Sequence, residues 1–485
     1  MKLKINKKNL IIYIFILLVI AGTILPRSVD NLDEIWNFNF AKCIANGLIP
    51  YKDFNIIQGP LLPSICAIFL KIFGQEMIVM RVLAIVLNTT ILFFTYKIMD
   101  KLKIKDYIKY IILITLIYIM KDYFTIDYNW STLAIVLLII YIDLFKEENI
   151  KKNIIIGFLA GTLIALKQTT GVVISVVTIG YRIIEIRNKQ DIKIILKSTL
   201  IKLLTAIFVV FVLLAILYKQ GALYYYIDYA IKGVTTFTNK ISYVQRLIKN
   251  KNVIIKILSV SPIVIYLLLA VLYYKNNKKE GLTLLIYSFV QMVLVYPISD
   301  ESHFVIAILP TLISIAYLIN LLADKVKVTR KEEFIANTIL ECLCISLVVI
   351  FSIKGFEIYR SQNINKELNH FKYLPMSEQM ISEIKEVGEY INKNDHTYIL
   401  DATAALYMIP LDRYNKNFDL FLKGNLGAKG EKGQIENLEN MEEKTILIMK
   451  DTLRRNWQNP EEVRNYIKQN MTKIETIGVF DVYRN

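Results

Sequence analysis

The chain is constrained above all by apolar segments, each about 14 to 21 residues long, that recur through its first 353 residues. A helix rises about 1.5 Å per residue, so roughly 20 apolar residues cross the hydrocarbon core of a bilayer. A chain that is 55% hydrophobic with a mean hydropathy of +0.43 is also too apolar for a soluble enzyme. The pattern therefore predicts an all-α multi-pass membrane protein with about eleven transmembrane helices. We expect these helices near residues 9–25, 78–96, 107–126, 130–145, 153–166, 171–184, 198–218, 253–273, 281–297, 303–322 and 335–353.

Two apolar segments, one of them the first in this series, need a separate interpretation. The segment Leu61–Phe73 is short and begins between Pro60 and Pro63, so we expect it to be re-entrant or to lie along the membrane interface. The N-terminal run at 9–25 resembles a signal peptide, but it lacks a small-residue cleavage site and further spans follow it. We therefore interpret it as the first transmembrane helix.

The net charge of +16 could indicate a nucleic-acid partner, but the basic residues form short clusters between the apolar runs. Such clusters are typical of loops in membrane proteins, and we exclude nucleic acid as a partner. Lys and Arg are more abundant in the loops that share a side with the N-terminus, which predicts a cell-membrane protein with a cytoplasmic N-terminus. The outer face would then hold the C-terminal tail and the acids Asp33, Asp53, Asp122, Asp127 and Asp300.

The cysteines give no sign of a metal or redox site. Cys43, Cys66, Cys342 and Cys344 lack the spacing of either, and the last two lie inside an apolar run, so we interpret all four as packing residues. The sequence neither requires nor excludes a divalent metal as a cofactor.

The tail differs in character from the apolar part. A charged helical pattern runs through 354–394, and strand and helix patterns alternate from 395 onward. The sequence therefore predicts a transmembrane domain at 1–353, a helical connector at 354–394 and a small extracytoplasmic α/β domain at 395–485. Within that domain we expect strands at Thr397–Leu400 and Thr445–Met449, a helix at Pro460–Gln469, and closing strands within Ile474–Tyr483.

An acidic pair, Asp33 and Glu34, follows the first span directly and precedes Trp36 and Phe38. A carboxylate at this depth stays partly solvated yet lies close to lipid, which suits a general base acting on a lipid-linked substrate. The alternative is a helix cap at the outer interface.

A second acidic cluster, Asp122 and Asp127, lies where the third span turns into the fourth. Acids from two outer loops could converge on one cavity, with one serving as base and the other positioning the acceptor or a metal. Simple solvation of loop acids is the alternative.

His303 lies beside Asp300 and Glu301 at the outer end of a span. One histidine and two neighbouring acids supply too few ligands for an evident metal site, so substrate hydrogen bonding is the better functional interpretation. A capping motif for the following span explains the same residues equally well.

The run from Asp33 through NGLIPYKDFNIIQGPLLPSICAIFLKIFG to Arg81 resembles the first outer loop of the lipid-dependent GT-C glycosyltransferases. These include the protein mannosyltransferases and the aminoarabinose transferases of lipid A. Their pattern is an acid, an aromatic-rich amphipathic helix, a G-x-x-P-Y-x-D-like turn, a proline-led apolar helix, a closing F-G and an Arg. The resemblance continues through DYNWSTLA at Asp127, GTLIALKQTTG at Gly161–Gly171 and PISDESHF at Pro297–Phe304, whereas the tail matches only in its general position.

This resemblance implies a GT-C fold and a hexosyl or pentosyl transferase that uses a polyprenyl-phosphate sugar. In such enzymes the first-loop acid removes the proton of an acceptor hydroxyl, which attacks the anomeric carbon with inversion. The acceptor would be a cell-envelope glycan, lipid or protein, and membrane lipid would surround the enzyme. The implied catalytic residues are Asp33 as base, Glu34 as its supporting neighbour, and Asp127 in the acceptor site.

The sequence departs from the family at Gln58 and Gly59, where members often have a Lys before the prolines. Lys167 and Arg81 are the remaining basic candidates for the lipid phosphate, although Lys167 could instead snorkel at a helix end. The further candidates for substrate binding are Asp53, Asp122, Asp300 and His303.

Two other classes of function compete with the glycosyltransferase. A transporter or flippase of a lipid-linked sugar should show repeated halves with broken helices at matching positions, and the sequence shows no such repeat. A non-catalytic membrane scaffold that displays its outer domain would make the two acidic clusters accidental.

Overall fold

The computed structural model describes residues 7–186, 189–237, 241–249, 251–276, 278–325, 329–415, 418–453 and 459–484. Residues 1–6 and residue 485 lie outside these ranges. They are the two ends of the chain, for which the sequence predicts opposite sides of the membrane. The chain forms two compact units, and each is assembled from segments far apart in the sequence. Unit 1 comprises Met1–Leu25, Ala84–Phe211 and Lys240–Glu357, and unit 2 comprises Pro26–Leu83, Val212–Asn239 and Ile358–Asn485.

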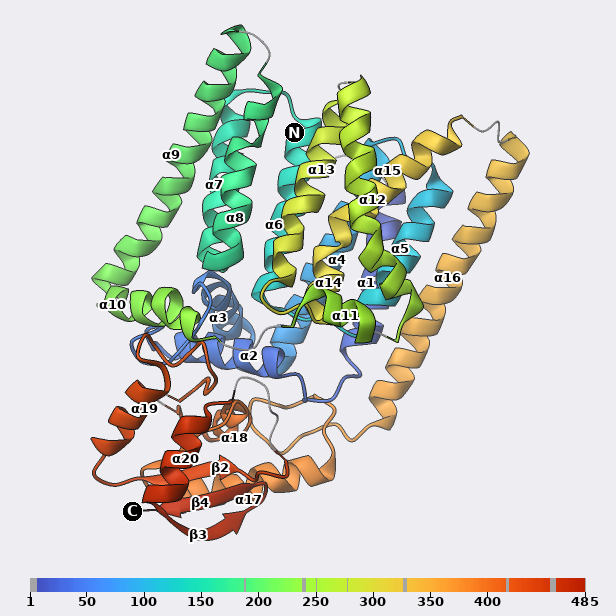
Figure 1. Cartoon of the computed structure of the whole chain (residues 1–485). Helices are drawn as coiled ribbons and strands as arrows, with labels where there is room; N and C mark the ends of the chain where they lie inside the picture. Colours follow the sequence, from blue (N-terminus) through green and yellow to red (C-terminus); the bar gives the residue numbers. More distant parts are fainter. Residues whose placement is uncertain are drawn as a thin grey trace. The chain divides into compact units, whose positions relative to one another are not determined.

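Unit 1 is helical, and a helix occupies each apolar segment that the sequence analysis identified (Figure 1). The prediction of helices there is confirmed, but some ends differ: α5 ends at Met120, before the expected 126, and α16 continues to Ser361, beyond the expected 353. The α-helices that lie wholly or mostly in unit 1 are α1 (Lys7–Ile24), α4 (Met77–Lys101), α5 (Asp106–Met120), α6 (Tyr128–Phe145), α7 (Ile150–Leu166), α8 (Gln168–Gly180), α9 (Lys189–Lys219), α11 (Tyr243–Lys249), α12 (Val253–Asn276), α13 (Lys279–Gln291), α14 (Glu301–Ala307), α15 (Leu309–Ala323) and α16 (Arg330–Ser361).

Six of the described helices are long and apolar enough to cross a membrane, and the chain is a multi-pass membrane protein. The helices α14 and α15 meet at a bend of 44°. They would make a seventh span if the two together cross the membrane. The helices α5, α7, α8 and α13 are shorter, with 13 to 17 residues each.

Polar caps and one close backbone approach explain how unit 1 is organised locally. Asp127, Asn149 and Asp300 precede α6, α7 and α14, and each side chain accepts a hydrogen bond from a backbone N–H of the first turn. The helices α7 and α8 lie side by side (Figure 1). A Cβ atom at Gly171 would lie 2.2 Å from the carbonyl oxygen of Leu163, so only glycine allows this approach.

Unit 2 combines the long loop after α1 with the tail. The loop forms α2 (Leu32–Ala45) and α3 (Leu61–Phe73), which pack against each other. At 13 residues, α3 is too short to span a bilayer. The other helices of this unit are α10 (Leu223–Tyr226), α17 (Glu378–Lys393), α18 (Ala404–Met408), α19 (Gly430–Glu439) and α20 (Glu461–Asn470).

The tail holds a four-stranded sheet in the order β1-β2-β4-β3, in which β1 and β2 are parallel and the other neighbours are antiparallel. Its core contains residues such as Phe418, Ile446 and Val463. The strands expected at the two ends of this domain, the central strand and the late helix are confirmed. The strands are β1 (Thr397–Ile399), β2 (Thr445–Met449), β3 (Thr472–Ile477) and β4 (Phe480–Arg484).

Candidate functional site

The first acidic pair lies in the first turn of α2, in unit 2. The helix begins after Asn31, whose side chain accepts a hydrogen bond from the backbone N–H of Glu34 at 3.2 Å. The N-cap of this helix is therefore Asn31, and neither Asp33 nor Glu34 is the capping residue. Asp33 is half-buried, whereas Glu34 is buried. A carboxylate in the first turn is stabilised by the helix dipole, which favours the ionised form that a general base needs.

Glu34 is bound to Arg81, at the beginning of α4. The Nε atom of Arg81 donates to one carboxylate oxygen at 2.8 Å, and Nη2 donates to the other at 3.2 Å. The same guanidinium donates to the carbonyl oxygens of Arg27 at 2.6 Å and Ser28 at 3.1 Å. Arg81 is fully buried, and its contacts with Glu34 hold the start of α2 against α4.

Asp53, also in unit 2, closes a turn in the loop between α2 and α3. Its carboxylate accepts a hydrogen bond from the backbone N–H of Ile49 at 2.7 Å, across Tyr51, whose φ is 68°. Gln58, at the position where the family often has Lys, is buried, and its carbonyl oxygen accepts from the Tyr51 hydroxyl at 2.5 Å. The observed contacts of Asp53 are those of a turn-forming residue.

Charged residues of the tail hold this loop within unit 2. Lys42 of α2 pairs with Asp412 at 2.5 Å, and His370 lies 2.9 Å from the same carboxylate. Partial burial opposes ionisation of Asp412, but the hydrogen bonds from these two residues lower its pKa. Asp419 is fully buried beside the backbone N–H of Asn55 at 3.4 Å, and this burial raises the pKa of Asp419 to about 7.

In unit 1, Asp127 and Lys167 lie close together at the ends of neighbouring helices. Asp127 caps α6 by accepting from the backbone N–H groups of Asn129 at 2.6 Å and Trp130 at 2.9 Å. The Nζ atom of Lys167 donates to the Asn129 side chain at 2.8 Å and lies 4.8 Å from the centre of the Tyr128 ring. Burial raises the pKa of Asp127, against the opposing effect of those backbone hydrogen bonds.

His303 also affects the ionisation of Asp127. Its charged form, like that of Lys167, lowers the pKa of Asp127, so the three residues share one neighbourhood. The carboxylate of Asp300 accepts from the His303 backbone N–H at 2.9 Å and lies 2.7 Å from its Nδ1 atom. Burial opposes ionisation of Asp300, but these bonds lower its pKa. Asp300 therefore caps α14 and orients His303 at once.

The surroundings of Asp122 differ from those of Asp127, Asp300 and His303. Its side chain is 70% exposed and pairs with the adjacent Lys121 at 2.9 Å. This geometry matches a solvated loop acid.

The structure reveals one further candidate, Arg246 of α11, which the sequence analysis does not single out. Arg246 is 5% exposed and lies against the rings of Phe304, at 3.8 Å, and Tyr243, at 4.6 Å. Its Nε and Nη2 atoms donate to the hydroxyls of Ser299 at 3.2 Å and Ser259 at 2.8 Å.

The Nη1 atom of this guanidinium is buried and has no hydrogen-bond partner in the described part of the chain. A buried cation whose observed contacts are with hydroxyls and aromatic faces, and which keeps one N–H group unused among the described residues, retains a donor for an anion. In the sequence, the nearby Tyr243 is the one feature that could indicate a role for Arg246, and a single tyrosine is a weak signal.

Among the residues that the structure describes, no three His, Cys, Asp or Glu side chains are arranged to hold a metal ion. The candidate side chains described above are carboxylates, the histidine His303 and the cations Lys167 and Arg246.

The apolar helices, the helical loop after the first of them and the small α/β tail together form the GT-C fold of membrane glycosyltransferases. Two structures of the aminoarabinose transferase ArnT from Cupriavidus metallidurans, one bound to undecaprenyl phosphate and one in the apo state, match this chain with a TM-score of 0.57. Sequence identity is 9%, and each match covers 98% of this chain and 97% of that chain, so the likeness is one of fold over nearly the whole length.

The archaeal oligosaccharyltransferase AglB from Archaeoglobus fulgidus, in complex with an inhibitory peptide and a dolichol-phosphate, matches with a TM-score of 0.45 at 11% identity. That match covers 91% of this chain and 69% of that chain. Searches of protein-family models and of curated protein sequences found no match.

Proposed function

We propose that this protein is an inverting membrane glycosyltransferase. It moves a hexosyl or pentosyl group from a polyprenyl-phosphate donor to a hydroxyl of a cell-envelope glycan, lipid or protein on the outer face of the membrane. The observation that carries the proposal is the half-buried Asp33 in the first turn of α2, within a GT-C fold that extends over nearly the whole chain. The undecaprenyl phosphate bound in an ArnT structure supports a polyprenyl-phosphate donor.

In this proposal Asp33 is the general base. Its ionised carboxylate accepts the proton of the acceptor hydroxyl, whose oxygen forms a bond to the anomeric carbon on the face opposite the leaving group. The bond from the anomeric carbon to the phosphate oxygen breaks, and the polyprenyl phosphate leaves with the electron pair. A single displacement of this kind inverts the anomeric centre.

Glu34 is the supporting neighbour of the base. Because its carboxylate is bound to Arg81, it positions α2 and is poorly suited to accept a proton from substrate. The same contact changes our interpretation of Arg81: its donors bind Glu34 and two backbone carbonyls, so we assign it to positioning and no longer to the donor phosphate.

For the phosphate we propose Lys167, as the sequence suggested, and add Arg246. Lys167 is a compact charge held by Asn129 and Tyr128, and Arg246 offers the buried Nη1 donor. Asp127 shapes the acceptor site, with Asp300 and His303 as hydrogen-bonding groups for substrate. The substrate roles of Asp53 and Asp122 stay predictions, and their observed contacts favour a turn and a surface ion pair.

We also propose that the bent pair α14 and α15 and the shorter helices α5, α7, α8 and α13 cross the membrane with the longer ones, which gives about eleven spans. The N-terminus is then cytoplasmic and the domain at 395–485 extracytoplasmic, after a connector at 354–394. The enrichment of Lys and Arg in the loops on the N-terminal side supports this orientation.

The test is to incubate the purified chain with synthetic polyprenyl-phosphate hexoses and pentoses and with cell-envelope glycan, lipid and protein fractions as acceptors. Donor consumption and release of polyprenyl phosphate are then measured. The Asp33→Asn variant should be inactive, and the matched Asp395→Asn variant, at an acid of the tail whose side chain is 86% exposed, should be active. A flippase would instead move the lipid-linked sugar across vesicles without consuming it. If no donor is consumed under any condition and the donor crosses vesicles, the glycosyltransferase proposal is wrong.

A further inference from the structure

A pocket of about 550 Å³ lies within unit 1, between α1, α5 and α16. This volume is within the range of about 300 to 1,000 Å³ that is usual for pockets that bind small molecules. Most of the side chains that line it are apolar, among them Phe15, Ile345 and Val348. The residues proposed above for glycosyl transfer do not line it.

The pocket exists because α1 and α16 touch near one end and separate toward the other. At Gly22 of α1, a Cβ atom would lie 2.4 Å from the carbonyl oxygen of Phe351. At Gly355 of α16, a Cβ atom would lie 2.2 Å from the carbonyl oxygen of Gly22. The two backbones therefore cross in direct contact, and the pocket opens between the helix halves that precede the crossing.

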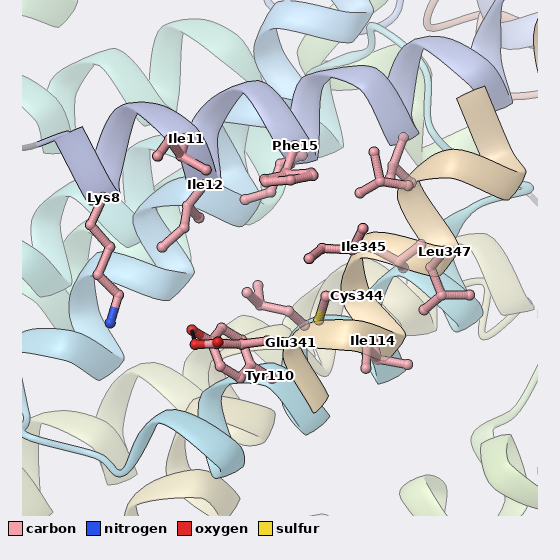
Figure 2. A pocket seen from close by; sticks show the side chains of 15 residues that line it. Lys8, Ile11, Ile12, Phe15, Tyr110, Ile114, Glu341, Cys344, Ile345 and Leu347 are labelled. Atoms are coloured by element: carbon pink, nitrogen blue, oxygen red, sulfur yellow. Dashed lines mark hydrogen bonds between the residues drawn. The ribbon is translucent and has the colours of Figure 1, made fainter. Parts of the chain in front are cut away.

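The polar groups of the pocket gather toward one side. In Figure 2 the side chains of Lys8, Tyr110 and Glu341 lie toward one side, and Ile345 and Leu347 lie toward the other. Lys8 pairs with Asp106 at 3.0 Å, and the Tyr110 hydroxyl donates to Glu341 at 3.0 Å. Asp106 and Tyr110 are four residues apart on α5, so the two contacts lie about 6 Å apart along that helix.

Glu341 is unusual because it is a carboxylate within a long apolar helix. No Lys, Arg or His among the described residues lies within ion-pair distance of it, and its one hydrogen bond comes from the neutral Tyr110. A carboxylate at membrane depth is costly unless a cation compensates it, and such residues usually mark a binding site. The missing partner is therefore a cation with hydrogen-bond donors.

We propose that this pocket binds one phospholipid whose headgroup carries a primary amine, as in phosphatidylethanolamine. The ammonium donates to Glu341, the phosphate lies toward Lys8, and one acyl chain follows the apolar wall between α1 and α16. The separation of polar and apolar lining matches the shape of a single lipid, and the acidic and basic groups match the two charges of its headgroup. Because α1 and α16 diverge from their crossing, the lipid can enter sideways from the bilayer.

The proposal distinguishes among common lipids. Phosphatidylcholine carries a positive charge but no N–H donor, and phosphatidylglycerol has no cation to offer Glu341. A hydrogen bond that involves a charged group is worth about tenfold in affinity. The purified wild-type chain should therefore bind dioleoyl phosphatidylethanolamine about tenfold more tightly than either of the other two dioleoyl lipids.

Native mass spectrometry of the full chain, released from detergent with each lipid in turn, measures these affinities. The Glu341→Gln variant keeps an acceptor for Tyr110 but removes the charge, so it should lose the tenfold preference. Its matched control is Glu333→Gln, which makes the same change on α16 outside the pocket and should keep the preference. The Ile12→Trp variant fills the pocket and should displace one bound lipid of every class.

Equal affinities for the three lipids in the wild-type chain would overturn the proposal, because they would indicate unspecific solvation by lipid. Tighter binding of phosphatidylglycerol would also overturn it, by assigning the pocket to an anionic lipid held at Lys8. A dimer that Ile12→Trp dissociates would assign the pocket to a second copy of the chain. If Glu341→Gln does not fold, two measurements still test the proposal. They are the comparison of the three lipids in the wild-type chain and the loss of bound lipid in the Ile12→Trp variant.

Discussion

The same chemical change at the adjacent acids Asp33 and Glu34 should affect two different properties of the protein, turnover at Asp33 and stability at Glu34. Replacing either carboxylate by its amide preserves shape and removes charge. Glu34 forms a buried ion pair, since its side chain is 9% exposed and that of Arg81 is 0% exposed. Asp33 is half-buried at the first turn of the same helix. We expect Glu34→Gln to damage stability and Asp33→Asn to damage turnover.

The magnitudes follow from these surroundings. Glu34→Gln leaves the Arg81 guanidinium buried without its counter-charge, and breaking a buried pair from one side costs about 3 to 5 kcal/mol. Asp33→Asn should change stability by only about 0.5 kcal/mol, because an isosteric change at a partly exposed position removes little packing. Its effect on turnover should be a loss of about 10² to 10⁴, the usual contribution of a general base.

Thermal unfolding of the purified variants, followed by tryptophan fluorescence, measures the stability effects. Trp36 lies on α2, and its indole N–H donates to the carbonyl oxygen of Ala402 at 2.7 Å, so it reports directly on the seating of that helix. Donor consumption measures turnover on the same samples. The double variant Glu34→Gln, Arg81→Gln should lose less stability than the two single changes added together, because no uncompensated charge remains.

The reasoning is refuted if Asp33→Asn unfolds the chain as readily as Glu34→Gln does, or if Glu34→Gln is as stable as the wild type. Normal transfer by a folded Asp33→Asn protein would place the base elsewhere.

Three other predictions concern the phosphate site, the tail and the topology. Lys167→Ala and Arg246→Gln should each weaken binding of polyprenyl phosphate about tenfold or more, measured by titration, because each removes a charged donor; unchanged affinity in both would remove the phosphate assignment. The pKa of Asp419 is about 7 in the folded chain against an ordinary value of 3.8, so the folded state holds the proton between these values and stability should fall as pH rises from about 4 to 7. The Asp419→Asn variant should lack this fall, on the order of 4 kcal/mol, when thermal unfolding is compared across pH, whereas a parallel pH dependence in both proteins would contradict it. Protease added to intact cells should cleave a tag after the domain at 395–485 but not a tag before α1, and the reverse pattern would exclude an extracytoplasmic tail.

The helices and strands were largely predictable because their signals are local. A run of apolar residues becomes a helix in a membrane wherever it stands in the fold, since its backbone must satisfy its own hydrogen bonds. The strand patterns at Thr397–Leu400 and Thr445–Met449 are equally local, and the structure confirms both. The GT-C fold was accessible for a related reason: the acid, the turn and the proline-led helix that carry the resemblance are contiguous between Asp33 and Arg81.

The partners of the charged side chains were not predictable in this way. The sequence places Glu34 and Arg81 47 residues apart, and nothing in it says that they form a buried pair instead of acting separately on substrate. Nothing in the sequence singles out Arg246, and only the tertiary structure shows that it is a buried cation packed against Phe304 and Tyr243.

The sequence alone thus determined that the chain is a multi-pass helical membrane protein with an acid in its first long loop and an α/β tail. Composition, apolar length and short motifs carry that information, and each acts within a few turns of the chain. Only the tertiary structure decided which acid is neutralised by Arg81, which cation keeps an unused donor and where Gly22 meets Gly355. Those outcomes depend on which side chains lose water together when distant segments pack, and no local pattern encodes that.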